Sequence, residues 1–297
     1  MRKSISSWFT SSSRNWHENS FNYRRRGFIG KRLVEANIDA GFKVEVLVAP
    51  GEPGIKALRD QGVDVLIGNT ADYHAIEHAV GGVDTVFHSA PPLETCRPQA
   101  CRSTHVTGME NLCKAALAKN VKHLVYSTSH DVFGYKGDWV IDESRPYRYW
   151  GETFPDCLID AAKAAWNFHK KGLPLTMVYA ASLYGKGSPL VQCGSNYFSV
   201  QMENLIPFLM IAAQNPNAMG EGFLLLEPHC EYRTPVTHSV RYIQALANAK
   251  IKERLAKWFN KPLHPYKTAY SAKSYYSALR YSGAKAKQKL DWKPSPV

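Results

Sequence analysis

Two apolar runs joined by one helical stretch constrain the fold of this chain more than any other feature. Residues 83–90 and 121–129 are mainly apolar and end in small or hydroxyl side chains, and residues 105–118 carry apolar side chains at helical spacing. A helical crossover is how neighbouring parallel strands are joined, so the two runs predict adjacent strands of one parallel sheet. Ligands of such sheets bind beyond the carboxyl ends of the strands. The residues expected to line that site are Ser89, Ala90, Ser127 and Ser129.

The same alternation of apolar strand and helix continues on both sides of this unit. Strands are predicted at residues 43–48, 63–67 and 175–179, with helices at residues 29–40, 55–61, 72–80 and 157–169. Alternation of this kind predicts the α/β class, as a Rossmann-like, doubly wound parallel sheet. Residues 27–185 are therefore predicted to form a Rossmann-like domain, of the kind that commonly binds dinucleotides. Residues 186–297 lose the alternation and are predicted to form a mixed C-terminal substrate lobe.

Residues 1–26 differ from the rest of the chain, because they are rich in Ser and Arg and poor in acids. This basic N-terminal extension is typical of an organelle transit segment and equally of a disordered tail. A dinucleotide-binding sheet should begin with a buried strand feeding a glycine turn, but residues 19–26 contain no Val or Ile. Either the first strand is poor, or the sheet begins at the second strand.

The formal net charge of +12 is concentrated at the two ends of the chain, and the body is mildly acidic. Basic ends could attract RNA, an anionic membrane surface or a phosphorylated substrate, but a leader peptide and a solvated face explain them more simply. Nucleic acid is therefore not the expected partner.

The longest apolar run is too short to span a bilayer. Scattered cysteines and histidines predict neither a disulfide framework nor a metal site. A cytoplasmic location is expected, or a mitochondrial one if residues 1–26 are a transit segment.

Several short motifs occur along the chain in one order. They are Gly27-Phe28-Ile29-Gly30, Val106-Thr107-Gly108 with Asn111-Leu112, Leu183-Tyr184-Gly185 and Leu290-Asp291-Trp292-Lys293-Pro294, together with the runs at residues 83–90 and 125–134. In this order and spacing the chain resembles the extended short-chain dehydrogenase/reductase superfamily of sugar epimerases, dehydratases, dihydroflavonol reductases and 3β-hydroxysteroid dehydrogenases. The resemblance implies NAD or NADP as cofactor and hydride transfer on a sugar-nucleotide, a steroid or another hydroxyl or carbonyl substrate.

The resemblance also implies which residues hold the cofactor. The turn containing Gly27, Phe28, Ile29 and Gly30 would bind the pyrophosphate, although Arg24 stands where the family has its first glycine. Asn69 stands at the position that touches adenine. The second strand ends in Val48-Ala49-Pro50, which selects neither NAD nor NADP. The remaining residues expected to contact the cofactor are Ser89, Ala90, Ser127 and Lys163.

Chemistry in this family resembles a Ser-Tyr-Lys arrangement, in which the tyrosine exchanges the proton. Ser129 and Lys163 match the serine and the lysine, but Ile159 occupies the tyrosine position. Three alternatives remain open. Another tyrosine, Tyr147 or Tyr149, could take over, or Asp160 or a water could act in a different reaction. The third alternative is that the proton transfer has been lost.

Two functions follow from these alternatives. The first is an NAD(P)-dependent oxidoreductase or epimerase of the extended short-chain dehydrogenase type. The second is a catalytically inactive, nucleotide-binding relative that acts as a scaffold or regulator. Family members often pair through two long helices, which predicts a homodimer formed by residues 105–118 and 157–169.

Overall fold

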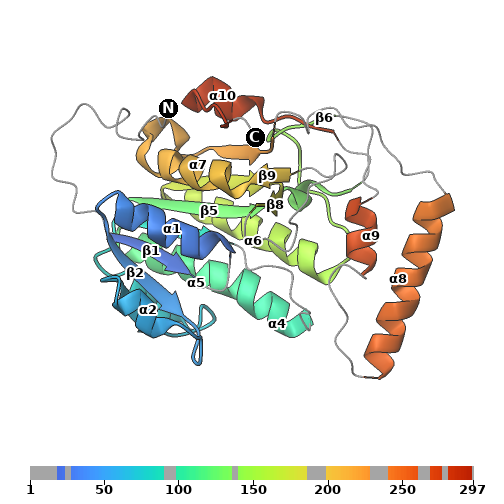
Figure 1. Ribbon diagram of the computed structural model, residues 1–297, viewed down its shortest axis with the longest axis horizontal. Coiled ribbons are helices and arrows are strands. Elements are labelled where there is room, and N and C mark those ends of the chain that lie inside the picture. Colours follow the sequence, from blue (N-terminus) through green and yellow to red (C-terminus); the bar gives the residue numbers. More distant parts are fainter. Residues whose placement is uncertain are drawn as a thin grey trace.

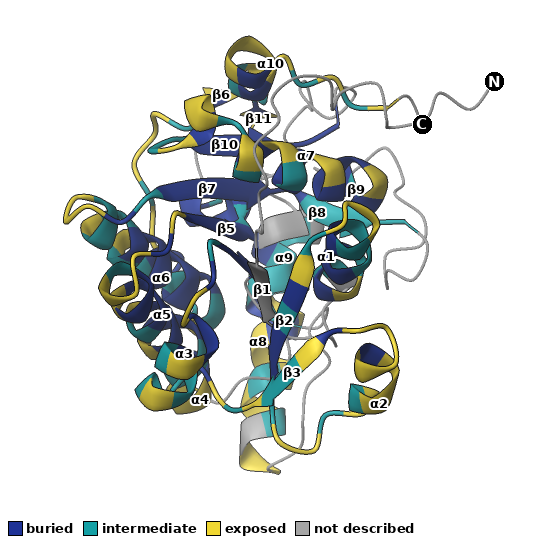
Figure 2. Cartoon of the chain, turned by 90° about the vertical axis from the view of Figure 1, so that its left-hand side faces the viewer, coloured by how far each residue is buried: buried dark blue, intermediate teal, exposed yellow. Residues whose placement is uncertain are grey.

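The computed structural model describes residues 19–23, 28–89, 98–135, 140–185, 199–227, 240–259, 268–275 and 280–295. In this part of the chain a central sheet lies between two layers of helices, as Figures 1 and 2 show. The helices α1 and α7 cover one face of the sheet, and α3, α5 and α6 cover the other. This arrangement confirms the predicted doubly wound α/β sheet.

The main sheet has seven strands in the order β10-β7-β5-β4-β1-β2-β3, and every neighbouring pair is parallel. The order reverses between β4 and β1, which is where a crevice opens in sheets of this type. The strands are β1 (Asn19–Tyr23), β2 (Lys43–Val48), β3 (Asp64–Ile67), β4 (Thr85–Ser89), β5 (His123–Ser129), β7 (Leu175–Ala180) and β10 (Gly222–Leu225).

The sequence left open whether the first strand exists, and the structure contains it. Although residues 19–23 contain no Val or Ile, they form β1 and pair with both β2 and β4 at the centre of the sheet. The strand lies inside the segment predicted as a basic extension. Its central position shows that neighbouring strands on both sides can impose strand structure on a sequence with weak intrinsic preference.

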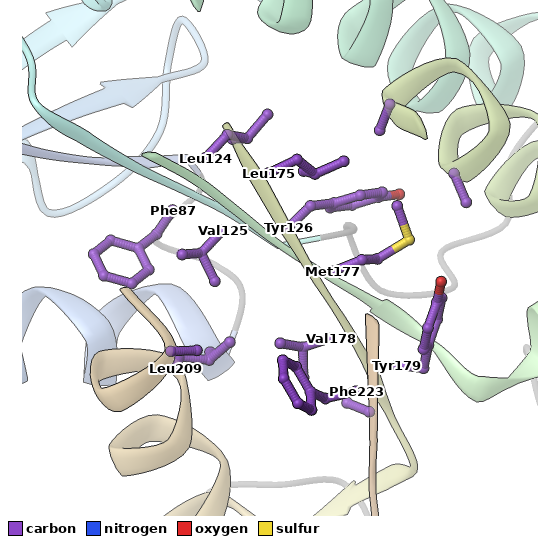
Figure 3. Close-up of a cluster of buried hydrophobic side chains, with 14 of the residues drawn as sticks. Phe87, Leu124, Val125, Tyr126, Leu175, Met177, Val178, Tyr179, Leu209 and Phe223 are labelled. Atoms are coloured by element: carbon purple, nitrogen blue, oxygen red, sulfur yellow. The ribbon is translucent and has the colours of Figure 1, made fainter. Parts of the chain in front are cut away.

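The inner strands are apolar on both faces because helices cover both. Figure 3 shows Leu124, Tyr126, Leu175 and Met177 on one side of β5 and β7, and Val125 and Val178 on the other. Val125 and Val178 lie with Phe87 from β4 and Leu209 from α7. All of these side chains are buried, and Figure 2 shows β5, β7 and β10 in the dark blue of buried residues.

The helices match most of the predicted positions. The predicted helix at residues 105–118 is part of a longer helical stretch, in which a π-helical turn, η2 (Ser103–Thr107), joins α4 (Pro98–Arg102) to α5 (Gly108–Ala118). The other helices are α1 (Phe28–Asp39), α2 (Ile55–Arg59), α3 (Tyr73–Ala79), α6 (Thr153–His169), α7 (Met202–Gln214), α8 (Val240–Trp258), α9 (Ala269–Tyr275) and α10 (Ala284–Leu290), with the 3₁₀ turns η3 (His130–Phe133) and η4 (Pro216–Ala218).

The C-terminal part is tied to the main sheet and to its carboxyl edge. Strand β10 extends the main sheet, although its residues belong to the segment predicted as the lobe. Two separate two-stranded parallel sheets lie outside it, formed by β6 (Val140–Ile141) with β11 (Arg280–Tyr281) and by β8 (Ser182–Tyr184) with β9 (Ser199–Gln201). Helix α8 packs against α9 and extends away from the body (Figure 1). Among the described helices, none is long and apolar enough to cross a membrane.

Candidate functional site

The carboxyl ends of β4 and β5 bring two of the predicted serines together. Ser89 pairs with Ser127 across the two parallel strands, and both side chains are buried. They lie at the edge of the sheet next to the reversal of strand order between β4 and β1. Ala90, also predicted for this edge, lies outside the described residues. Small side chains at this position leave room for a ligand to approach the sheet.

The predicted pyrophosphate turn is only partly described. Arg24 and Gly27 lie outside the described residues. Helix α1 begins directly after them at Phe28, and Gly30 is buried in its first turn. Ile29 is half-buried and packs against the main core. A helix that begins at the carboxyl end of a central strand presents its first N–H groups to a ligand at that edge.

Asn69 follows β3, and its side chain has a clear local role. Its Oδ1 accepts a hydrogen bond from the backbone N–H of Ala71 at 3.1 Å, which closes a turn before α3. The same turn is held from α5, because Asn111 Nδ2 donates to the carbonyl oxygens of Thr70 and Ala71 at 3.0 Å each.

Ser129 lies at the end of β5 and caps the short helix η3. Its Oγ accepts a hydrogen bond from the backbone N–H of Asp131 at 3.2 Å and donates to Asp131 Oδ2 at 2.6 Å. The same carboxylate oxygen accepts a hydrogen bond from Tyr270 Oη of α9 at 2.5 Å. Burial, and then the charge of Asp131, raise the pKa of Tyr270 well above its usual value. The predicted serine is therefore held by a buried carboxylate.

Lys163 lies on the exposed side of α6, and its Nζ donates a hydrogen bond to Tyr149 Oη at 3.1 Å. The ammonium also lies 4.4 Å from the centre of the Tyr149 ring. The phenol in turn donates to Asp160 Oδ1 at 2.7 Å, and Arg102 Nη1 donates to Asp160 Oδ2 at 3.1 Å. A phenol therefore lies between an ammonium and a carboxylate, and 52% of the Tyr149 residue is exposed to solvent.

Ile159 lies one helical turn before Lys163, at the position of the family's tyrosine. It is 0% exposed and belongs to the main hydrophobic core. The hydroxyl of the other candidate tyrosine, Tyr147, bonds to other residues. It contacts Tyr179 Oη at 2.5 Å and accepts from Trp166 Nε1 at 2.8 Å. Of the two tyrosines considered from the sequence, Tyr149 is the one that contacts Lys163.

A network around Trp150 connects Ser129 with Lys163. Trp150 follows Tyr149 in the chain, and its Nε1 donates to the backbone oxygen of Asp131 at 2.6 Å. Its backbone N–H donates to Asp156 Oδ1 at 2.7 Å. Contacts thus run from Ser129 through Asp131 to Trp150, and the residue before Trp150 in the chain is Tyr149, whose hydroxyl contacts Lys163.

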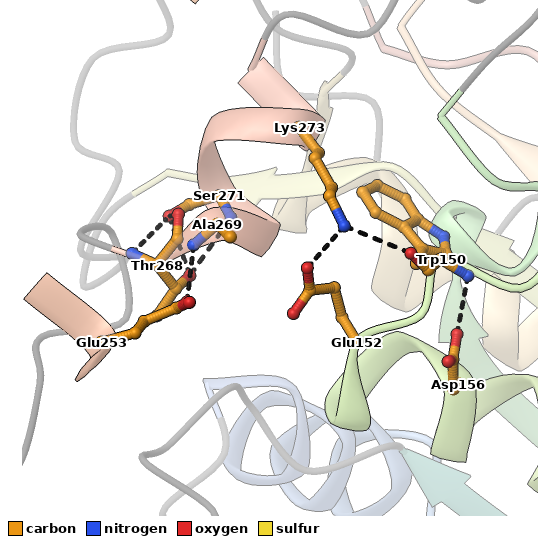
Figure 4. Close-up of polar contacts among 8 residues, drawn as sticks. All are labelled: Trp150, Glu152, Asp156, Glu253, Thr268, Ala269, Ser271 and Lys273. Carbon is orange, nitrogen blue, oxygen red and sulfur yellow. Dashed lines mark hydrogen bonds and ion pairs between the residues drawn. The ribbon is translucent and has the colours of Figure 1, made fainter. Parts of the chain in front are cut away.

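Helix α9 packs over this network, as Figure 4 shows. Lys273 is buried, and its Nζ donates to Glu152 at 2.5 Å and to the backbone oxygen of Trp150 at 3.2 Å. The ring of Tyr270 lies 5.1 Å from that of Trp150. At its N-terminal end, α9 is held to α8 by a hydrogen bond from the Ala269 backbone N–H to Glu253. These contacts attach the C-terminal part to the edge that carries Ser129.

Two histidines lie close to the same strand ends. His88 is buried in β4 beside Tyr126, and His105 is buried in the π-helical turn η2. Burial, and to a smaller extent the charge of His105, lower the pKa of His88 to about 3. His88 is therefore neutral near pH 7.

Sequence reasoning missed Asp131, Tyr270, Glu152 and Lys273 as neighbours of the site. A local signal existed for Asp131, because a serine two residues before it at a strand end is a common turn-capping arrangement. The partners on α9 had no such signal, since Tyr270 lies 139 residues from Asp131 in the chain. Within the described residues, no group of three or more His, Cys, Asp or Glu side chains could hold a metal ion.

Comparison with known proteins gives matches in both sequence and structure. A family model described as the NmrA-like family matches residues 26–142. Cinnamoyl-CoA reductase 1 of Petunia hybrida is 25% identical over 291 residues, covering 88% of this chain and 83% of that protein. A 3 beta-hydroxysteroid dehydrogenase/Delta 5→4-isomerase of Mycobacterium tuberculosis (strain H37Rv) is 31% identical over 151 residues, covering 48% of this chain and only 39% of that protein.

Solved structures share the fold over nearly the whole chain. The Bordetella bronchiseptica enzyme WbmG, in complex with NAD, matches with a TM-score of 0.67 at 16% identity, covering 96% of this chain and 91% of WbmG. The match includes the described C-terminal part as well as the sheet. The motifs, the order of the strands and the match along most of the petunia reductase agree in their similarity to the extended short-chain dehydrogenase/reductase superfamily.

Proposed function

We propose that this protein binds NAD or NADP at the carboxyl edge of its sheet and catalyses hydride transfer on a hydroxyl or carbonyl substrate. In this proposal residues 27–185, together with β1, form the dinucleotide-binding part, and residues 186–297 provide the cover for the substrate. The relatives that match the chain include a reductase and a dehydrogenase, which supports this class of reaction.

The side chains at the sheet edge suit a nicotinamide dinucleotide. Its ribose hydroxyls and pyrophosphate need hydrogen-bond donors and positive charge. Ser89, Ser127 and Asn69 follow or end strands of the sheet and would supply donors, and Lys163 would supply the positive charge. The first turn of α1, with Gly30 buried, supplies backbone N–H groups for the pyrophosphate. The end of β2 carries neither an acid nor an arginine, which is compatible with either cofactor.

One observation carries the proposal of activity, namely the 3.1 Å hydrogen bond from Lys163 Nζ to Tyr149 Oη. The helix position that supplies the family's tyrosine holds Ile159, so a proton donor must come from another element. Tyr149 reaches Lys163 from the segment before α6, and the residue is exposed to solvent.

Each residue would have its own role in the proposed reaction. Ser129 would orient the reacting oxygen of the substrate. A proton leaving a substrate hydroxyl would pass to Tyr149 Oη as the phenol's own proton passes to Asp160 Oδ1, and the reverse would protonate a carbonyl oxygen. Lys163 would stabilise the charge on the phenol oxygen during transfer. A bound nicotinamide would supply the hydride acceptor or donor.

A second candidate is a nucleotide-binding relative without turnover, acting as a scaffold or regulator. It is favoured by the complete burial of Ile159 in the core, because that position has become part of the packing. The same edge of the sheet would bind the dinucleotide in both cases. Both candidates therefore predict dinucleotide binding, and only the first predicts turnover of a substrate.

Calorimetric titration with NAD⁺, NADH, NADP⁺ and NADPH at two salt concentrations tests the proposal. Saturable binding of at least one dinucleotide is expected, and Lys163→Met is expected to weaken it about tenfold by removing one charge-assisted hydrogen bond. Lys170→Met is the matched control, because Lys170 is exposed at the end of the same helix. If none of the four dinucleotides binds saturably, the proposal is wrong. Binding without turnover of steroid, sugar-nucleotide or phenylpropanoid alcohols and carbonyls supports the second candidate.

Homodimerisation through α5 and α6 is part of the proposal, as is a cytoplasmic or, with a transit segment, mitochondrial location. Both helices pack on the same face of the sheet and contact each other. Light scattering of the purified protein tests the dimer, and fluorescence of a C-terminal fusion in cells tests the location.

A further inference from the structure

Helix α8 and the residue after it carry half of the large apolar side chains that are exposed in the described part of the chain. Of the ten such residues, five lie between residues 243 and 259, namely Ile243, Ile251, Leu255, Trp258 and Phe259. Single exposed apolar residues are ordinary on a protein surface, but a group of them on one element marks an interaction surface. Figure 1 shows α8 extending away from the body of the molecule, where a large partner can reach it.

The exposed apolar side chains form one stripe along the helix. Each member follows the one before by three or four positions, which places them on the same face: Ile243, Ala247, Ile251, Leu255 and Trp258. The rings of Trp258 and Phe259 are stacked with their centres 6.3 Å apart, and 83% and 64% of these residues are exposed. The stripe therefore ends in two aromatic side chains that face solvent.

The opposite side of α8 packs against α9. Ala249 is buried, Leu246 is half-buried, and Glu253 Oε1 accepts a hydrogen bond from the Ala269 backbone N–H at 2.7 Å. These contacts hold the helix with its stripe turned outward. Within the described residues, packing thus accounts for one side of α8 and leaves the stripe for a partner outside the chain.

Positive charge borders the stripe on both sides. Lys250 and Lys252 are exposed and come directly before and after Ile251, so they point about 100° to either side of it. Arg254 is exposed as well, and the one acid between residues 240 and 259 is Glu253, which bonds to α9. Long basic side chains can lay their methylene groups along apolar surface while their charged ends reach a polar layer.

We propose that the exposed face of α8 docks on the surface of a lipid bilayer that contains anionic lipids. The stripe would enter the boundary between headgroups and acyl chains, with Trp258 and Phe259 at its end, and the basic residues would lie against the anionic headgroups. A nucleic acid would use the basic residues but leave Ile251 and Leu255 without an apolar partner. A second copy of the helix would bring like charges together. This inference is independent of the proposed reaction.

Cosedimentation of the full chain with lipid vesicles tests the inference. Vesicles of phosphatidylcholine with about 30% phosphatidylserine should bind wild type at least about tenfold more tightly than pure phosphatidylcholine, because each basic residue near an anionic surface contributes roughly fivefold. Added salt should weaken this binding, since exposed charges are screened.

Two double variants separate the apolar contribution from the charge. Ile251→Ser with Trp258→Ser should weaken binding to the anionic vesicles at least about tenfold by removing apolar surface. Lys250→Gln with Lys252→Gln should weaken the same binding about tenfold or more and leave binding to pure phosphatidylcholine unchanged. Because all four side chains are exposed, the variants should fold, and thermal unfolding checks this.

Each double variant has a matched control elsewhere on the surface. Ile211→Ser with Met219→Ser removes two exposed apolar side chains outside α8. Lys170→Gln with Lys171→Gln removes two exposed lysines at the end of α6. Both controls should bind the anionic vesicles within about twofold of wild type, which is less than the contribution of one basic residue at the membrane surface.

Absence of binding to the anionic vesicles, or equal binding by wild type and both α8 variants, would overturn the inference. Binding of single-stranded RNA without binding of vesicles would assign the basic helix to nucleic acid instead. A dimer in light scattering that Ile251→Ser with Trp258→Ser disrupts, without any vesicle binding, would assign the stripe to a second copy of the chain. Either of these two results would also overturn the proposal.

Discussion

Tyr149 Oη accepts a hydrogen bond from Lys163 Nζ at 3.1 Å, although the two residues lie 14 positions apart and on different elements. In the family motif the tyrosine and the lysine share one helix, four residues apart. Here the lysine remains on α6, and the phenol comes from the segment that precedes the helix. Side chains from separate elements can thus restore a contact that the helix no longer provides.

The role of Tyr149 predicts a loss of turnover without a loss of cofactor binding. Tyr149→Phe keeps the ring over Lys163 but removes the hydroxyl, and we expect kcat on any alcohol that wild type oxidises to fall at least about 10²-fold. Single-turnover measurement of nicotinamide absorbance checks this. Tyr147→Phe is the control, since Tyr147 bonds to Tyr179 and Trp166 and should leave kcat within about threefold. Comparable losses in both variants would remove Tyr149 from the mechanism.

The burial of Ile159 predicts that restoring the family's tyrosine does not restore the family's site. Ile159→Tyr places a larger, polar side chain into a fully buried position and should lower the free energy of unfolding by about 1–3 kcal/mol. Ile159→Val, which only shrinks the side chain, should cost about 0.5–1.5 kcal/mol. Urea denaturation measures both values. An Ile159→Tyr protein that is as stable as wild type and more active would contradict this interpretation.

Gly134 sits between η3 and the segment that carries Tyr149, with φ of 89° and ψ of −165°. An added Cβ would lie 2.9 Å from Arg148 Cβ, so Gly134→Ala combines an unfavourable backbone conformation with a clash. We expect a loss of about 1–3 kcal/mol in stability and a shift of the neighbouring Tyr149. Gly151→Ala is the matched control, because Gly151 has φ of 71° but no atom within 4 Å of an added Cβ. The urea midpoint of Gly134→Ala should be lower than that of Gly151→Ala. Equal midpoints would mean that the clash is relieved at no cost.

The lowered pKa of His88 predicts that the folded protein loses stability in acid. Its pKa is about 3 in the folded protein and 6.5 in its unperturbed state, so below pH 6.5 the unfolded chain binds a proton that the folded chain does not. Stability should therefore be fully present above pH 6.5 and fall as the pH drops toward 3, by up to about 1.4 kcal/mol for each pH unit.

Comparison with His88→Asn isolates this contribution, because asparagine does not titrate. Between pH 6.5 and 4, the urea midpoint of wild type should fall more steeply than that of the variant. His123, whose pKa burial also lowers, stays in both proteins and supplies the common background. If the urea midpoints of the two proteins changed in parallel with pH, protonation of His88 would not affect stability.

Much of the fold followed from the sequence because its signals are local. Apolar runs bounded by turn residues mark the strands at residues 43–48 and 175–180 with little error, and each strand end carries its small or hydroxyl residues with it. Ser89 and Ser127 could be assigned to one edge because parallel neighbours end at the same side of a sheet. The first strand was harder to predict, since its residues have little strand preference and their pairing on both sides comes from β2 and β4.

The amino-acid sequence by itself determined the order of strand and helix. It also predicted Ser129 and Lys163 as site residues, with Ile159 at the position of the family's tyrosine. Only the tertiary structure decided that Tyr149 reaches Lys163 and that Tyr270 of α9 shares Asp131 with Ser129. Periodicity reports which face of an element is buried, because that depends on neighbours within a few residues. It does not report which side chains meet across 139 positions, because that contact depends on how the C-terminal part packs against the finished sheet.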